Sequence, residues 1–220
     1  MTIDYAQARH AMVEQQVRPW EVLDARVLEV LGTLPREEFV PEAYRAVAYG
    51  DLEIPLGHGQ RMLKPVLAGR TLEALRPQDG ESVLEIGTGS GYVSAALGMM
   101  AREVLSLERE AKLADTARQR LVALGHNNVS VEHADAFSWE TERRFDVICV
   151  NAAVDEMPAR FIQWLRPGGR MFIIRGRAPV MEAVLVHRDG DDVNATRTRS
   201  LFDTELAYLA GAAPVAEFQL

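Results

Sequence analysis

A short apolar run followed by alternate glycines is the most distinctive pattern in the chain. Residues 82–86 are apolar and rich in β-formers, which predicts a buried strand, and residues 92–100 have the apolar spacing of a packed helix. Between them stand Gly87, Gly89 and Gly91. Glycines at such a turn permit positive φ angles and let a ligand lie against bare backbone at the start of the helix. The pattern predicts a nucleoside-cofactor site, and a tight turn without a ligand is the alternative.

Apolar periodicity beyond the glycine loop predicts strands that alternate with helices. The predicted strands cover residues 103–107, 129–133, 145–150 and 170–174, and the predicted helices cover residues 110–124 and 158–165. Such alternation is typical of a parallel sheet with helices on both faces. Residues 181–187 are predicted to pair with a second strand that follows the turn at residues 189–192, which gives a terminal hairpin.

The chain before the glycine loop has a different organisation. Helical spacing covers residues 4–17 and ends at Pro19, a second helix begins at the cap Asp24, and a short helical turn lies between Pro35 and Pro41. These pieces are predicted to form an appendage without a core of its own.

A long segment rich in turn-forming residues connects this appendage to the rest. Residues 49–65 are expected to be a long ordered loop, which inside a compact domain is often functional, and residues 66–75 a helix. We therefore expect residues 1–78 to form an N-terminal helical segment with a substrate and cofactor loop. Residues 79–220 would form the cofactor-binding core, and the two parts one compact domain.

Composition narrows the class of protein. With 220 residues, 48% of them hydrophobic, the chain suits one globular domain. No apolar run has membrane-spanning length and the first residues lack a signal-peptide pattern, which predicts a cytoplasmic protein. A net charge of −8 argues against binding nucleic acid through a broad basic surface, although a local basic groove is still allowed. Cys149, the single cysteine, lies in an apolar run and is expected to fill core space rather than act as a nucleophile.

The residues around the glycines indicate which cofactor is bound. A dinucleotide fingerprint needs a third glycine at position 92, where this chain has Tyr92. Glu85 precedes the first glycine, where it would repel a pyrophosphate but attract a ligand that carries an ammonium and a sulfonium group. The pattern favours S-adenosylmethionine over NAD.

Polar residues follow three of the predicted strands, where ligands of open α/β sheets bind. Glu108 could accept hydrogen bonds from both ribose hydroxyls, or it could be an acid that favours a helix start. Asp135 could accept from an adenine amino group, or it could form a turn. Asn151 could contact cofactor or substrate, or bond its own backbone. In the preceding loop, His58 and Lys64 together with Arg61 would suit a carboxylate-bearing substrate, or form a solvated loop face.

Several segments of the chain resemble the protein-L-isoaspartate O-methyltransferase family. The matching segments are residues 12–16, 27–28, 34–41, 48–51, 54–60, 83–92, 106–109, 127–129 and 145–148. The resemblance implies a seven-stranded, mostly parallel Rossmann-like sheet with helices on both faces and an N-terminal helical extension. It also implies methylation of the carboxylate of L-isoaspartyl residues in damaged proteins, with S-adenosylmethionine as cofactor and S-adenosylhomocysteine as product.

The resemblance also implies a set of site residues, with no metal among the ligands. The cofactor would be bound by Glu85, Gly87, Thr88, Gly89, Gly91, Glu108, Arg109, Asp135, Ala136 and Asn151. Gln60 and Arg61 would hold the reacting carboxylate, with His58 and Lys64 as further substrate contacts.

Three departures from the family pattern concern the substrate more than the cofactor. Where the family has Gly-Gln-Thr-Ile-Ser-Gln-Pro, this chain has Arg61 and Leu63 in place of the hydroxyl residues. The family's Asp-Gly is Asp135-Ala136 here, and residues 200–206 stand where the family has a Val-Arg-Phe-Val-Pro segment. Two alternatives stay open: a paralogue that methylates another acceptor, and a cofactor-binding protein without catalysis. A NAD oxidoreductase is disfavoured by Tyr92.

Overall fold

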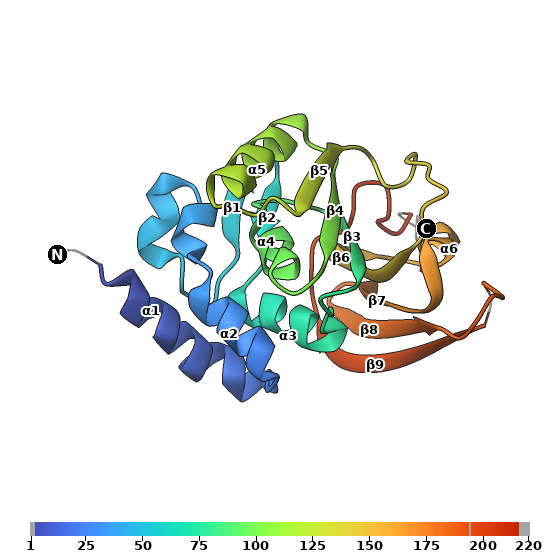
Figure 1. Cartoon of the computed structure of the whole chain (residues 1–220), viewed down its shortest axis with the longest axis horizontal. Helices are drawn as coiled ribbons and strands as arrows, with labels where there is room; N and C mark the ends of the chain where they lie inside the picture. Colours follow the sequence, from blue (N-terminus) through green and yellow to red (C-terminus); the bar gives the residue numbers. More distant parts are fainter. Residues whose placement is uncertain (1–2, 194, 216–220) are drawn as a thin grey trace, which may run out of the picture.

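A seven-stranded sheet forms the centre of the molecule (Figure 1), and the computed structural model describes residues 3–193 and 195–215. The strand order is β5-β4-β3-β6-β7-β8-β9. Neighbouring strands from β5 to β7 run parallel, whereas β8 runs antiparallel to both of its neighbours. The strands are β3 (Ser82–Ile86), β4 (Glu103–Glu108), β5 (Val129–His133), β6 (Phe145–Val154), β7 (Leu165–Arg177), β8 (Val180–Arg188) and β9 (Thr196–Thr204). The predicted mostly parallel seven-stranded sheet is confirmed.

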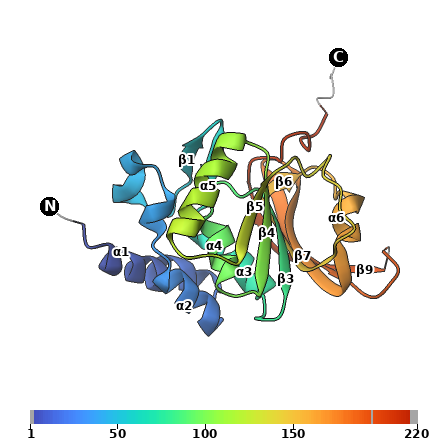
Figure 2. The same ribbon diagram turned by 45° about the horizontal axis from the view of Figure 1, so that its top comes forward.

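Helices cover both faces of the sheet (Figure 2). On one face, α3 (Pro65–Leu75), α4 (Tyr92–Gly98) and α5 (Ala111–Ala123) contribute to a large hydrophobic cluster that contains Val83 and Val147. On the other face, α6 (Ala159–Gln163) packs with Leu84 and Ile86 in a second cluster. Successive residues of β3 therefore alternate between the two clusters, as the period of a strand requires.

Local sequence signals explain where several helices begin. Asp4 caps α1 (Tyr5–Met12) by accepting a hydrogen bond from the Gln7 N–H, and Asp24 caps α2 (Ala25–Thr33) in the same way. Pro65 is the first residue of α3, where its missing N–H costs nothing. The helix predicted over residues 4–17 consists of α1 and the π-helical η1 (Val13–Val17), and a short 3-10 turn that contains Pro19, η2 (Arg18–Trp20), follows it.

The N-terminal helices pack directly on the sheet domain. Buried residues of α1 and α2 belong to the same cluster as α3 and the sheet. Gly69 of α3 permits this contact, since a Cβ there would lie 2.7 Å from Val17 Cγ1. Two further 3-10 segments, η3 (Arg36–Phe39) and η4 (Glu42–Val47), complete the connection. The predicted boundary near residue 78 stays a prediction, and across the described residues the two parts share one core.

Two local expectations were wrong. Residues 49–65 were expected to be a loop, but they contain an antiparallel hairpin formed by β1 (Ile54–Gly57) and β2 (Gln60–Met62). Pro55 and the turn glycines interrupt the apolar alternation that would have predicted these strands. Residues 167–169 were expected to precede a strand, but they lie inside β7, where the pairing with β6 shifts register and accommodates the turn formers as a bulge. No helix within residues 3–193 and 195–215 is long and apolar enough to cross a membrane.

Candidate active site

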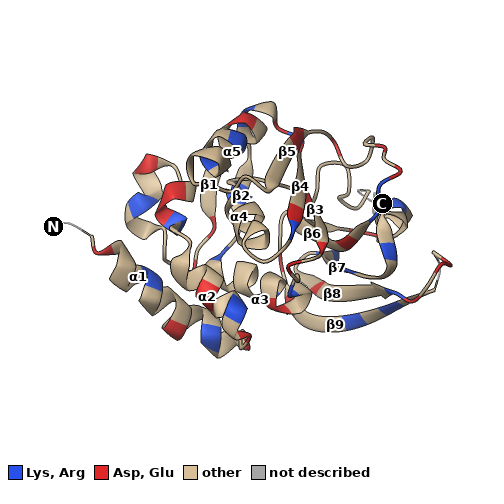
Figure 3. Cartoon of the chain, in the orientation of Figure 1, with Lys and Arg blue, Asp and Glu red and all other residues tan. Residues whose placement is uncertain are grey.

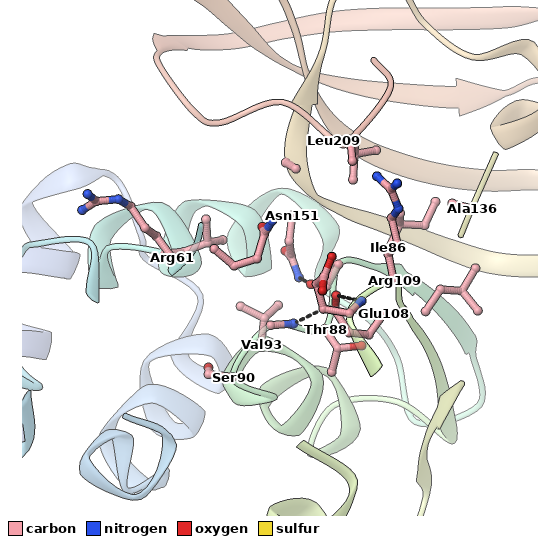
Figure 4. A pocket seen from close by; sticks show the side chains of 18 of the residues that line it. Arg61, Ile86, Thr88, Ser90, Val93, Glu108, Arg109, Ala136, Asn151 and Leu209 are labelled. Carbon is pink, nitrogen blue, oxygen red and sulfur yellow. Dashed lines mark hydrogen bonds between the residues drawn. The ribbon is translucent and has the colours of Figure 1, made fainter. Parts of the chain in front are cut away.

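A cavity lies at the carboxyl ends of the central strands, between the sheet and the β1-β2 hairpin (Figure 4). Parallel strands bring residues that are distant in sequence to this one edge. Most of the residues predicted for the site line it: Gln60, Arg61, Leu63, Gly87, Thr88, Gly89, Glu108, Arg109, Asp135, Ala136 and Asn151. Apolar walls are added by residues that the sequence did not single out: Ile86, Val93, Leu107 and Phe137.

Four predicted residues lie outside the lining of the cavity. Gly91 is the N-cap of α4 with φ 86°, and a Cβ there would lie 3.4 Å from Ala117 Cβ, so its role is to let the loop pack against α5. His58 is at the tip of the hairpin, 3.9 Å from a Glu110 carboxylate oxygen. Lys64 is exposed at the start of α3. Glu85 is fully buried beneath the cavity and does not line it, and its part in cofactor binding stays a prediction.

Glu108 ties the glycine loop to the end of β4. One carboxylate oxygen accepts a hydrogen bond of 2.8 Å from the Gly89 N–H, and the other accepts one of 2.9 Å from the Glu110 N–H. Gly89 has φ +53°, and a Cβ there would lie 3.4 Å from Leu56 Cδ1 of the hairpin. A side chain at this position would therefore be strained. The carboxylate is therefore held at the edge of the cavity with lone pairs that can accept from further hydroxyl donors.

Asp135 forms the next part of the wall, at the end of β5. Its carboxylate accepts from the Phe137 N–H at 2.9 Å and lies 3.4 Å from Arg109 Nε. Asp135 therefore forms the turn that was predicted as an alternative, and it also lines the cavity. Phe137 extends this wall, and Arg160 of α6 holds the same loop by donating to the Trp139 carbonyl at 2.9 Å.

The buried carboxylate of Glu85 has three side-chain partners. It accepts hydrogen bonds from the hydroxyls of Ser94 and Ser106 and from the amide of Asn151, the last at 2.7 Å. Burial raises the pKa of Glu85 to about 7, against the opposing effect of these three donors. The three donors therefore limit the rise in pKa that burial alone would cause.

This raised pKa predicts a specific pH dependence of stability. The ordinary pKa is 4.5, so between about pH 4.5 and 7 the folded protein holds a proton that the unfolded chain has lost. As pH rises through this window, the contribution of Glu85 to the free energy of unfolding falls, by about 3 kcal/mol in total. A Glu85→Gln variant should lack this decline, measured by denaturant titration of both proteins at pH 5 and pH 7.5. Parallel pH profiles of the two proteins would contradict the assignment.

The hairpin supplies the wall opposite the strand ends. Gln60, Arg61 and the buried Leu63 line the cavity from β2 and the segment after it. The Arg61 side chain points away from Glu108 and Thr88 (Figure 4). It is exposed and makes no hydrogen bond or ion pair with a described residue. This guanidinium is therefore available to an anionic group approaching from outside.

A C-terminal segment closes the cavity from the remaining side. Tyr208 forms an isolated parallel bridge with Ala153, and the Leu209 N–H donates to the Ala153 carbonyl at 2.8 Å. Tyr208, Leu209 and Ala210 line the cavity. No pattern in the sequence indicated this segment, because it is irregular and has neither helical nor strand periodicity. Within the described part of the chain, no group of three or more His, Cys, Asp and Glu could hold a metal ion.

Comparison with known proteins identifies the family. The family model for protein-L-isoaspartate(D-aspartate) O-methyltransferase matches residues 7–202. A protein-L-isoaspartate O-methyltransferase of Myxococcus xanthus is 44% identical over 192 residues, which cover 86% of this chain and 91% of that protein. One from Syntrophus aciditrophicus is 36% identical over 208 residues, 94% of this chain and 95% of that protein. The chain belongs to the protein-L-isoaspartate(D-aspartate) O-methyltransferase family.

The fold agrees with a solved structure. A Plasmodium falciparum protein described as a protein-L-isoaspartate O-methyltransferase, in complex with S-adenosyl-L-homocysteine, matches with a TM-score of 0.78. The match covers 94% of this chain and 99% of that chain at 18% identity, which shows the fold. The predictions of the family, the fold and a methyltransferase that uses S-adenosylmethionine are confirmed at the level of the family.

Proposed function

We propose that the protein transfers the methyl group of S-adenosylmethionine to the carboxylate of L-isoaspartyl residues in damaged proteins, with the cavity residues in the following roles. The observation that carries the proposal is a single cavity that joins two strand-end acids, Glu108 and Asp135, to the hairpin wall of Gln60 and Leu63. The acids provide acceptors for a nucleoside, and the hairpin leaves an open approach for a second substrate.

The residues present fit S-adenosylmethionine. Glu108 can accept from the ribose hydroxyls, and Asp135 can accept from the adenine amino group beside the ring of Phe137. Ile86 and Leu107 offer apolar contact between these acceptors. Thr88 and Asn151 also line the cavity, and the methionine part would extend toward them.

The acceptor chemistry needs alignment more than proton transfer. A carboxylate is already ionised at neutral pH, so its oxygen forms the bond to the methyl carbon while the carbon–sulfur bond breaks and its electron pair stays on sulfur. The cofactor supplies the activated methyl group. We assign Gln60 and Arg61 to orient the acceptor, while Leu63 excludes water from this side because its side chain is apolar and buried.

Methyl transfer from labelled S-adenosylmethionine to an isoaspartyl peptide tests this function. The matching aspartyl peptide serves as the control, and binding of S-adenosylhomocysteine is measured calorimetrically alongside. Label on the isoaspartyl peptide alone is the expected result. Tight cofactor binding without transfer to either peptide would reject this acceptor, and the replacement of the family's hydroxyls by Arg61 and Leu63 then favours a paralogue with another acceptor or a non-catalytic protein.

An Arg61→Ala variant tests the acceptor side alone. We expect its KM for the isoaspartyl peptide to rise about tenfold, the size of one exposed charge-assisted hydrogen bond. The affinity for S-adenosylhomocysteine should stay unchanged, since Arg61 points away from the strand ends. Arg144→Ala, at an exposed arginine before β6, is the matched control. An unchanged KM in the Arg61→Ala variant would remove Arg61 from the acceptor site.

The distribution of charge bears on the kind of partner. Acidic and basic residues are interspersed along the described chain (Figure 3), and the net charge is −8. This supports a protein or peptide acceptor over nucleic acid, whose binding needs concentrated positive charge. We assign the protein to the cytoplasm, consistent with the sequence-based expectation. His58 and Lys64 stay proposed contacts for the flanks of the acceptor.

A further inference from the structure

The turn that follows β5 carries Asp135 into the cavity. The Asp135 carboxylate accepts from the Phe137 N–H at 2.9 Å, and its backbone carbonyl accepts from the Trp139 N–H at 2.8 Å. These bonds close one helical turn that begins at Asp135. The carbonyls at the end of such a turn have no partner within it, so their donor must come from another part of the chain.

Arg160 of α6 supplies this donor. Its Nη1 donates to the Phe137 carbonyl, and its Nη2 donates to the Trp139 carbonyl at 2.9 Å. A guanidinium suits this position because its nitrogens form a planar fork and because a cation is favourable at the carbonyl end of a helical turn. Asp135 and Arg160 therefore cap opposite ends of the same turn.

Aromatic packing fixes both the guanidinium and the turn on α6. Arg160 Cζ lies 5.4 Å from the centre of the Trp164 ring. The ring of Phe137 lies 5.7 Å from that of Phe161, and the ring of Trp139 meets that of Trp164 edge to face at 5.2 Å. Phe161 and Trp164 are themselves stacked and buried. Arg160 Nε is buried without a hydrogen-bond partner among the described residues, so the two carbonyls and the Trp164 ring hold this side chain in place.

The turn reaches the cavity, whereas Arg160 does not. Asp135, Ala136 and Phe137 line the cavity, and Arg160 is not among its lining residues. The other cation near the Asp135 carboxylate is Arg109, whose Nε lies 3.4 Å away on an exposed side chain. An exposed ion pair restrains its partners only weakly. The direction of the carboxylate therefore depends on the turn that Arg160 closes.

We propose that Arg160 is a positioning residue that fixes Asp135 so that the site distinguishes adenine from a 6-oxopurine. The inference rests on the proposed placement of the adenine at Asp135 and deepens it. A carboxylate offers only acceptors, which match the 6-amino group of adenine but oppose the 6-oxygen of hypoxanthine. A carboxylate that is free to shift can accept instead from the N1–H of hypoxanthine. Rejection of hypoxanthine therefore requires a fixed turn.

Calorimetric titration with two ligands tests the inference. The ligands are S-adenosylhomocysteine and its analogue in which hypoxanthine replaces adenine. The wild-type protein should prefer the adenine compound by about thirtyfold, the size of one charge-assisted hydrogen bond. Arg160→Ala should reduce this preference to less than about fivefold, because both carbonyls lose their donor. Arg160→Lys keeps the charge but lacks the fork, so a preference of about tenfold is expected.

The ratio of the two affinities separates positioning from general damage. A variant that is partly unfolded loses apparent affinity for both ligands by the same factor, so its ratio stays at the wild-type value. Arg166→Ala is the matched control. It removes a guanidinium that pairs with Asp146 near the start of β6, at the opposite end of the strand from the cavity. Its ratio should equal that of the wild-type protein.

A double variant tests whether Arg160 acts through Asp135. Asp135→Ala alone should abolish the preference for adenine, and adding Arg160→Ala should change the ratio by less than about twofold, because both changes remove the same interaction. A preference for adenine that survives in Asp135→Ala would overturn the inference, since another group would then read the base.

The outcomes also separate this inference from the proposed function. An unchanged ratio in Arg160→Ala and Arg160→Lys, or in Arg160→Lys alone where Arg160→Ala does not fold, would overturn the positioning role and leave cofactor binding intact. Equal affinity of the wild-type protein for both ligands would do the same. Failure of the wild-type protein to bind S-adenosylhomocysteine would instead reject the cofactor assignment.

Discussion

A Glu108→Gln variant is expected to bind S-adenosylhomocysteine about a hundredfold more weakly than the wild-type protein. The carboxylate holds the glycine loop through the Gly89 N–H at 2.8 Å and is also the assigned acceptor for the ribose hydroxyls. Glutamine keeps the size but turns one acceptor into a donor and removes the charge. Hydrogen bonds to a charged group contribute about 1.5–3 kcal/mol each, so the loss of one of them accounts for the expected change.

Calorimetric titration of purified protein measures this effect directly. Glu103→Gln is the matched control, since it makes the same chemical change at the opposite end of the same strand. Its affinity should equal that of the wild-type protein. If Glu108→Gln retained an affinity within threefold of wild type, the ribose would have to be bound elsewhere in the cavity.

An Arg36→Ala variant is expected to lose about 4 kcal/mol of unfolding free energy. Arg36 is fully buried, donates to the Ala48 carbonyl at 2.7 Å and the Leu63 carbonyl at 2.6 Å, and stacks 4.8 Å from the centre of the Tyr92 ring. Truncation leaves two carbonyls without their donor and opens a cavity, and these costs combine. Arg36→Lys keeps the charge but has no planar fork, so about half of the loss is expected.

Denaturant titration monitored by circular dichroism would measure these changes. Arg45→Ala, at a largely exposed residue of η4 with one surface ion pair, should change stability by less than about 0.5 kcal/mol. A loss below about 1 kcal/mol for Arg36→Ala would show that the carbonyls find other donors. Because Leu63 lines the cavity, partial loosening of this contact should also raise the KM for the acceptor before it changes cofactor affinity.

The strand ends were the part of the site that the sequence predicted well. Glu108 and Asp135 follow buried strands, and the parallel arrangement places both at one edge whatever the details of packing. Glu85 was predicted as a site residue from its closeness to the glycines, but it does not line the cavity. It lies on the same face as Val83 and opposite Ile86, so the alternation of β3 already directed it away from the cavity floor.

The hairpin and the C-terminal segment of the site could not be predicted from the sequence pattern. The β1-β2 hairpin is short and contains Pro55 and two turn glycines, which read locally as a loop, and only its pairing reveals the strands. Tyr208 and Leu209 reach the cavity through one bridge to the end of β6, a contact between positions more than fifty residues apart. Such contacts depend on the folded path of the chain and not on local propensity.

The path of that C-terminal segment has a consequence for how the protein is made. The cavity takes one wall from Gln60 and another from Leu209, so it draws on residues that leave the ribosome before the strands of the sheet and on residues that leave after them. A nascent chain that has reached β9 already holds every strand of the sheet but still lacks Tyr208–Ala210. The cofactor therefore stabilises chains that include Tyr208–Ala210 more than shorter intermediates, and methyl transfer begins only after this segment has paired with β6.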